Sequence, residues 1–322
     1  MPLPQQPVVF MEVGFLAALC REMAKPFDEI ALPDNITFLK ELIFKRSTVY
    51  VNLTPETIIQ IAAADWRDDS ALPPEYKTAF PYLKKLMADG PFLRSWFPEV
   101  DTYKSADTEA IKRLGVKPNF LLLNDSPETC IDLQNKLGVI CISGNFKTEE
   151  YNIRFGFEPI DRLTSYDVNG FAAKVSQGNC LVIEDPYFAT NHCRFPDFVP
   201  KLLMALSGLE LETIPFPVLL VVKNDPDKTA EFETLTNFAN LINQELGDAI
   251  RVNVWKTRQR MHDRHIYSNT YWISCEGGFQ EKYNSPTKWN FHPLGLYYSG
   301  YQNRLQEISN WVKAGRAPHP LL

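Results

Sequence analysis

Basic side chains at alternate positions mark one segment of the C-terminal half as a candidate site for an anionic ligand. Lys256, Arg258 and Arg260 follow one another at every second position, and Arg264 continues the series. Residues two apart on a strand share a face, so this spacing predicts a local basic stripe. Such a stripe suits a phosphate backbone or a lipid head group. A solvated strand face without a ligand is the alternative.

A histidine lies inside this basic segment. His262, Arg264 and Asn269 have the spacing of the H-x-K-x-x-x-x-D motif of the phospholipase D superfamily, with Gly277-Gly278 downstream. The pattern therefore resembles that family, with arginine in place of lysine and asparagine in place of aspartate. His262-Asp263-Arg264 also resembles the version in the C-terminal domain of eukaryotic MIT-domain proteins. The order of the expected strands extends the resemblance over roughly residues 165–311.

The resemblance implies phosphodiester chemistry. In the family one histidine attacks phosphorus, a cation neutralises the phosphoryl oxygens, and a histidine from a second motif protonates the leaving group. On this basis the candidate catalytic residues are His262, Arg264 and Asn269, and the candidate phosphate-binding residues are His262, Arg264, Arg260 and Arg258. The chain has one copy of the motif, so catalysis would need a homodimer. Non-catalytic binding of a phosphate-bearing ligand and a structural hydrogen-bonded cluster are the other interpretations.

Acidic residues in the N-terminal half fall at the boundaries of the expected elements. Glu12 follows the first strand, Glu56 and Asp107 each begin a helix, and Asp125 ends a strand. This order is loosely similar to PIN-like nuclease domains, in which acidic residues at strand ends hold a divalent metal. The resemblance implies that these four residues bind Mg²⁺ or Mn²⁺. Acidic residues at helix starts also cap backbone amides, so a structural role is the alternative.

The elements that position these residues alternate between strand and helix in the first half. We expect strands at 7–11, 47–53, 119–125 and 139–143, and helices at 15–23, from 54, at 106–115 and at 126–138. The last strand, helix and strand predict a βαβ unit with parallel strands. Residues 66–101 are rich in proline and aromatics, which predicts helices joined by irregular loops.

The second half repeats the alternation. We expect helices at 166–175, 198–206, 229–246 and 302–312, and strands at 179–188, 215–222 and 249–255. The polar stretch 144–165 interrupts the pattern and predicts a domain boundary. The sequence therefore predicts an α/β protein of two domains, each a mainly parallel or mixed sheet flanked by helices. We assign residues 1–150 to a PIN-like domain and 151–322 to a phospholipase D-like domain.

Composition limits the environment and the partners. The 322 residues carry a net charge of −6, so a nucleic acid or an anionic membrane would need a local basic patch. Six scattered cysteines without a C-x-x-C pair predict buried thiols, a reducing compartment and a cytoplasmic location. The apolar N-terminal stretch lacks a basic region before it and is interrupted by Glu12, which predicts a strand and a helix rather than a signal peptide. No apolar run has the roughly 18 residues that a membrane span needs.

Two functional hypotheses follow. As a binding module, the second domain recognises a phosphate-bearing partner, nucleic acid or lipid head group, through His262, Arg264 and their basic neighbours. As an enzyme, the chain is a nuclease or phosphodiesterase that uses a dimeric histidine site or a metal-dependent acidic cluster. We favour binding because Arg264 keeps the positive charge of the motif. Turnover would also need the negative charge of the aspartate, which Asn269 lacks, and the histidine of a second motif. Whether the protein is an enzyme stays open.

Overall fold

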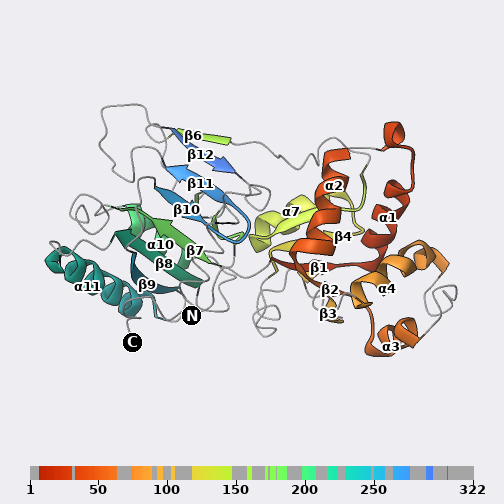
Figure 1. Cartoon of the computed structure of the whole chain (residues 1–322), viewed down its shortest axis with the longest axis horizontal. Coiled ribbons are helices and arrows are strands. Elements are labelled where there is room, and N and C mark those ends of the chain that lie inside the picture. Colours follow the sequence, from red (N-terminus) through yellow and green to blue (C-terminus); the bar gives the residue numbers. More distant parts are fainter. Residues whose placement is uncertain are drawn as a thin grey trace. The chain divides into compact units, whose positions relative to one another are not determined.

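The chain divides into two compact units in a computed structural model (Figure 1). One unit comprises Gln6–Ile153, and the other comprises Met1–Gln5 with Arg154–Leu322. The expected boundary at residue 150 lies outside the described residues. The structure describes the following ranges: 7–30, 33–63, 74–88, 93–96, 103–105, 118–146, 158–161, 171–172, 175–178, 180–186, 198–207, 216–223, 229–247, 250–257, 264–275, 288–292 and 303.

The first unit contains a five-stranded sheet with the order β3-β2-β1-β4-β5, and each pair of neighbours is parallel. Parallel neighbours require helical crossovers, which explains the alternating strand and helix pattern of this half. The strands are β1 (Val8–Met11), β2 (Thr48–Val51), β3 (Leu93–Trp96), β4 (Phe120–Leu123) and β5 (Ile140–Ser143).

Helices flank this sheet (Figure 1). The α-helices are α1 (Val13–Met23), α2 (Pro33–Glu41), α3 (Pro55–Ala63), α4 (Phe80–Ala88) and α7 (Pro127–Leu137). This unit also contains two 3₁₀ helices, η1 (Phe27–Glu29) and η3 (Pro74–Ala79), and one π-helical turn, η2 (Leu42–Arg46). No helix in the described part of either unit is long and apolar enough to cross a membrane.

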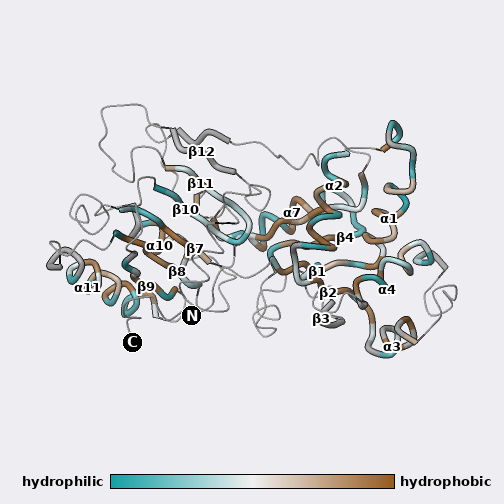
Figure 2. The backbone as a smooth tube through the Cα atoms, in the orientation of Figure 1, coloured by the Kyte–Doolittle hydropathy of each residue, from teal (hydrophilic) through white to brown (hydrophobic). Residues whose placement is uncertain are grey.

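The two central strands form the core of the first unit. All four residues of β4 are fully buried, and Val9, Phe10 and Met11 of β1 have no exposed surface. A strand covered on both faces needs a continuous apolar run rather than an alternating one, and FLLL is such a run. Figure 2 shows this hydrophobic stretch along β4.

The helix after β4 has the start and stop signals that its sequence predicts. Ser126 is the N-cap of α7, and its Oγ accepts a hydrogen bond from the Thr129 N–H at 3.3 Å. Pro127 occupies the first turn, and Gly138 ends the helix in the left-handed region with φ of 60°. The cap fixes where the helix begins, directly after the carboxyl end of β4.

Replacing Ser126 by alanine tests this cap. Loss of the Oγ acceptor leaves the Thr129 N–H dependent on water, so we expect the free energy of unfolding to fall by about 1 kcal/mol. Urea denaturation measures the change. Ser126→Asn should keep most of the stability because its side chain also accepts at an N-cap. Equal losses in the two variants would show that the cap does not matter.

The second unit contains a seven-stranded mixed sheet with the order β6-β12-β11-β10-β7-β8-β9. Strands β7, β8 and β9 are parallel neighbours, and the remaining pairs are antiparallel. The strands are β6 (Glu158–Asp161), β7 (Leu181–Glu184), β8 (Phe216–Lys223), β9 (Ile250–Thr257), β10 (His265–Tyr267), β11 (Trp272–Cys275) and β12 (Lys288–His292).

Two helices cover the parallel part of this sheet. They are α10 (Phe198–Ser207) and α11 (Thr229–Leu246). Leu202 and Leu206 of α10 and Leu235 of α11 pack with one face of β7, β8, β9 and β10 in a single apolar core. Figure 2 shows the hydrophobic character of β7 and β8 that supplies this core.

The expected α/β class is confirmed: the structure has helices and two sheets, one parallel and one mixed. The strand β3 lies inside residues 66–101, where the sequence suggested only helices and irregular loops, so that interpretation was incomplete. Helix α2 was not expected either. Its residues PDNITFLKE have a weak amphipathic pattern, but Phe38 and Leu39 are buried. The expected helices at 106–115 and 302–312 lie largely or wholly outside the described residues.

The thiols that the structure describes are buried and free, as expected: Cys20, Cys130, Cys141, Cys180 and Cys275. Cys193 lies outside the described part of the chain. Burial raises the pKa of Cys20 to about 12 against a small opposing effect of Arg21. Burial also raises the pKa of Cys180 to about 12, with a backbone hydrogen bond from Asn269 acting in the opposite direction.

We expect these two cysteines to resist alkylation. The thiolate is the nucleophile, and with a pKa near 12 it is nearly absent at pH 8. Iodoacetamide should therefore modify Cys20 and Cys180 at least about 100-fold more slowly in the native protein than in urea. Peptide mass spectrometry over a time course measures both rates. Equal rates in the two conditions would contradict the burial described.

Candidate functional site

The candidate site of the first unit lies where its strand order reverses. From β1 the chain proceeds to β2 and β3 on one side, and then to β4 and β5 on the other. Ligands of open parallel sheets bind at this point, outside the carboxyl ends of the two central strands. Glu12 directly follows β1, and Asn124 and Asp125 directly follow β4. The Glu12 N–H donates to the Leu122 carbonyl at 3.0 Å, which ties the two strand ends together.

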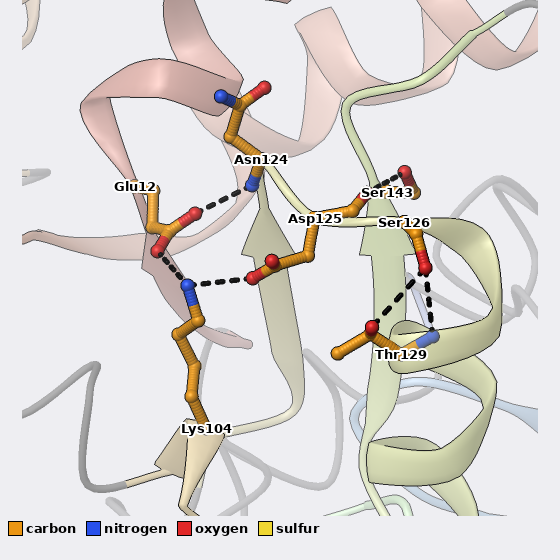
Figure 3. Close-up of polar contacts among 7 residues, drawn as sticks. All are labelled: Glu12, Lys104, Asn124, Asp125, Ser126, Thr129 and Ser143. Atoms are coloured by element: carbon orange, nitrogen blue, oxygen red, sulfur yellow. Dashed lines mark hydrogen bonds and ion pairs between the residues drawn. The ribbon is translucent and has the colours of Figure 1, made fainter.

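One lysine bridges the two carboxylates at this edge (Figure 3). The Nζ of Lys104 lies 2.9 Å from Oε1 of Glu12 and 2.6 Å from Oδ2 of Asp125. The second oxygen of Glu12, Oε2, accepts a hydrogen bond from the Asn124 N–H at 2.6 Å. Glu12 is only 8% exposed, so these partners replace water that its carboxylate would otherwise bind.

The lysine stays charged in this position. Burial alone lowers the pKa of Lys104, but its hydrogen bonds to Asp125 and Glu12 and their negative charges outweigh burial and raise that pKa above its usual range. Because the folded-state pKa is the higher one, the resulting stabilisation is fully present below about pH 10.4, the ordinary lysine value. It is lost only as the pH rises through the folded-state pKa.

The residue before the lysine fixes its position. Tyr103 is 1% exposed, and its ring centroid lies 5.1 Å from that of Phe10 in β1. An aromatic side chain buried against the central strand anchors the backbone of this segment. Lys104 therefore extends toward the sheet edge from a fixed base.

Hydrogen bonds around the two carboxylates hold the strand ends in register. Ser143, at the end of β5, donates its hydroxyl to the Asp125 carbonyl at 2.5 Å. Asn52, just after β2, accepts the Val13 N–H at 2.8 Å. The carboxyl ends of β1, β2, β4 and β5 thus all contribute polar groups to one edge of the sheet.

The four acidic residues that the sequence suggested have different positions. Glu12 and Asp125 meet at Lys104, Glu56 is exposed in the first turn of α3, and Asp107 lies outside the described residues. The described residues contain no group of three or more histidine, cysteine, aspartate or glutamate side chains that could hold a metal ion. Both oxygens of Glu12 are already engaged, so the described residues do not fit Mg²⁺ or Mn²⁺.

Sequence reasoning missed Lys104. The contact joins residues separated by 92 positions, and no helical or strand spacing relates them. The local signal is Tyr103 beside it, because an aromatic residue that becomes buried can fix the backbone of the neighbouring lysine. That signal is too common to identify a site.

The second unit has its own charged edge, again at a reversal of strand order. The chain runs from β7 to β8 and β9 and then returns to the other side of β7 as β10. Asp185 follows β7 and is 1% exposed, and its Oδ1 lies 3.5 Å from Nε of Arg264. The Arg264 side chain is 27% exposed. A buried carboxylate therefore holds an arginine whose side chain reaches solvent.

The register extends this edge across four strands. His265 pairs with Glu184, Glu184 pairs with Val221, and Val222 pairs with Lys256. The next residues along these strands, Arg264, Asp185 and Val222, therefore lie opposite one another, and Val222 pairs with Lys256. Arg264, Asp185 and Lys256 thus fall in one row on one face of the sheet. Arg264 and Lys256 are separated by three strand spacings, about 14 Å between backbones.

Helix direction adds positive potential at the same edge. Helices α10 and α11 connect parallel neighbours, so they run opposite to β7, β8 and β9. Their N-termini consequently face the carboxyl ends of these strands. Helix N-termini carry partial positive charge and unpaired N–H groups, which favours an anion nearby.

An ordered polar cluster lies behind Arg264. Glu184 is 2% exposed and accepts the Tyr267 hydroxyl at 2.8 Å. The Nε1–H of Trp272 donates to Nδ1 of His265 at 3.1 Å. Because Nδ1 accepts, the imidazole of His265 is neutral with its proton on Nε2. These contacts lock the first residues of β10.

The other motif residues are not brought together with Arg264 in the described part of the chain. Asn269 lies in the turn after β10, at the opposite end of that strand, where it is 1% exposed and accepts the Ser268 hydroxyl at 3.0 Å. His262, Arg258 and Arg260 lie outside the described residues. The basic stripe stays a prediction, because only its ends are described: Lys256 lies in β9, which ends at Thr257, and Arg264 directly precedes β10.

The comparisons with known proteins leave the family open. No family model matches the chain, and no curated protein matches it either. The phospholipase D-like and PIN-like resemblances therefore stay predictions from the sequence.

Proposed function

We propose that the protein binds a phosphate-bearing ligand, a nucleic acid or a lipid head group, without hydrolysing it. The observation that carries this proposal is the Arg264–Asp185 pair at the carboxyl edge of β7, β8 and β9. A buried aspartate fixes one side of the guanidinium, so less side-chain entropy is lost when the arginine binds an anion. Guanidinium groups match the geometry of phosphate oxygens.

Neighbouring groups support an anion at this edge. Lys256 lies in the same row of the sheet. The N-termini of α10 and α11 face the same side. Thr257 and Arg264, the described residues that flank 258–263 in the sequence, both lie at this edge. Arg258, Arg260 and His262 belong to that stretch, lie outside the described residues, and are assigned to the proposed anion site from the sequence alone.

Binding is favoured over catalysis by what surrounds the candidate residues. Arg264 and Asn269 lie at opposite ends of β10, so the described part of the motif does not form one reacting group. Nδ1 of His265 already accepts the Trp272 Nε1–H, so this nitrogen is not available as a general base. A nuclease reaction would still need a general acid and a nucleophile in one place.

Replacing Arg264 by alanine is the direct test. The variant should bind a phosphate-bearing probe with a free energy about 1.5–3 kcal/mol less favourable, the scale of a hydrogen bond to a charged group. Fluorescence anisotropy with a labelled single-stranded oligonucleotide, and flotation with vesicles that contain an anionic phospholipid, distinguish the two sources of phosphate. Competition by inorganic phosphate reports the shared chemistry.

Arg251 provides a matched control. Arg251 is exposed and is the second residue of β9, so it lies at the amino-terminal ends of the parallel strands, away from Arg264. Arg251→Ala removes the same charge and should leave binding within about twofold, since a distant surface charge is screened by salt. Equal loss in the two variants would mean that net charge, not this edge, attracts the probe. Undetectable binding of every probe by the unmodified chain would refute the proposal.

A further inference from the structure

The first unit holds two carboxylates at the position where a parallel sheet would present ligands to a divalent cation, yet the described residues do not fit one. Glu12 and Asp125 lie just after the carboxyl ends of β1 and β4, and one carboxylate oxygen of each points toward the same position (Figure 3). The atom at that point is Nζ of Lys104, at 2.9 and 2.6 Å. A protein ammonium therefore already bridges the pair and offsets one of its two negative charges.

Three observations make this ammonium a fixed part of the edge rather than a mobile surface charge. Tyr103 is buried against Phe10 and anchors the segment. The remaining oxygen of Glu12 is tied to the Asn124 backbone, so the carboxylate cannot easily rotate away. Lys104 itself is only 31% exposed in its side chain. A divalent ion would have to displace the Lys104 ammonium from the two carboxylates. The positive charge of the displaced lysine would then still repel the ion.

We propose that Lys104 is a resident cation that takes the place of a divalent metal in the first unit. The carboxylates of Glu12 and Asp125 then serve to hold the strand ends together through the lysine, and this edge works independently of Mg²⁺ and Mn²⁺. Removal of the ammonium exposes a latent site, because one or two carboxylates are the usual protein ligands of such an ion. This inference concerns the first unit and does not rest on the anion site of the second.

Manganese binding followed by electron paramagnetic resonance tests this directly. The full unmodified chain should leave the signal of free Mn²⁺ unchanged. Lys104→Met keeps the aliphatic stem and loses the charge, and it should bind one Mn²⁺ per chain with a dissociation constant of about 10⁻⁴–10⁻³ M, as weak carboxylate sites do. The double variant Lys104→Met with Glu12→Gln should lose that binding.

A matched control separates the site from general charge. Lys136 forms a comparable ion pair with Asp132 at 2.7 Å, but both side chains are more than half exposed. Lys136→Met should bind no Mn²⁺. The rise of the melting temperature with Mn²⁺ gives a second readout, expected for Lys104→Met and absent from the unmodified chain. Binding of Mn²⁺ by the unmodified chain that Glu12→Gln abolishes, or no binding by a folded Lys104→Met variant, would overturn the proposal.

Discussion

Glu12→Ala should lower the free energy of unfolding by about 3–4 kcal/mol. The carboxylate accepts from both the Lys104 ammonium and the Asn124 N–H, and each hydrogen bond to a charged group contributes about 1.5–3 kcal/mol. Glu12 is 8% exposed, so water cannot fully replace it. The change also leaves the Asn124 N–H at the strand end without its partner. Urea denaturation followed by circular dichroism measures the loss.

An exposed ion pair provides the control for this prediction. Glu41 and Lys45 pair on the surface of the same unit, with side-chain exposures of 28% and 63%. Glu41→Ala should cost no more than about 0.5 kcal/mol, since exposed pairs contribute little. If both alanine variants lose the same stability, the bridge at the sheet edge has no special role.

Gly178→Ala should destabilise the second unit by about 3 kcal/mol or more. A Cβ at this position would lie 1.5 Å from Oγ and 2.5 Å from Cβ of Ser268, closer than real atoms approach. Ser268 is fully buried in the turn between β10 and β11 and cannot move away freely. Overpacking of a buried position usually costs about 1–3 kcal/mol, and so short a contact with a fully buried side chain is at the upper end.

A hydrogen bond holds the turn around Ser268 against the segment of Gly178, so the turn cannot easily shift to relieve the clash. The Tyr271 hydroxyl donates to the Val175 carbonyl at 2.8 Å, which draws this turn against the segment that contains Gly178. Adding Ser268→Gly to Gly178→Ala removes the clashing atoms and should restore part of the stability. Gly247→Ala is a useful comparison: nothing lies within 4 Å of its Cβ, and only its positive φ of 58° opposes the change. It should cost about 1–2 kcal/mol.

Much of the fold could be predicted because local signals agree with the sheet. The run FLLL is apolar without alternation and becomes a fully buried central strand. Ser126, Pro127 and Gly138 set the limits of α7. The strand β3 was missed because LRSW has an arginine and a serine at its two central positions, and its place in the sheet comes from pairing with β2.

The candidate sites were harder to predict from the sequence. Glu12 and Asp125 come together because β1 and β4 are neighbours, which the strand-end positions suggested. Lys104 joins them through a contact over 92 positions. Asp185 directly follows β7, but its pairing with Arg264 depends on β10 returning to the other side of β7. Strand order, which no local pattern encodes, decides both sites.

We propose that the chain binds a phosphate-bearing ligand and leaves its ester bonds intact. Incubation of the full chain with labelled RNA and DNA, each with Mg²⁺, Mn²⁺ or EDTA, tests this when retention and cleavage are read from the same samples. We predict retention of the intact probe that is indifferent to EDTA and weakened by Arg264→Ala. Probe cleavage that requires metal and disappears with Glu12→Gln would contradict the account, and so would EDTA-resistant cleavage that disappears with His262→Ala.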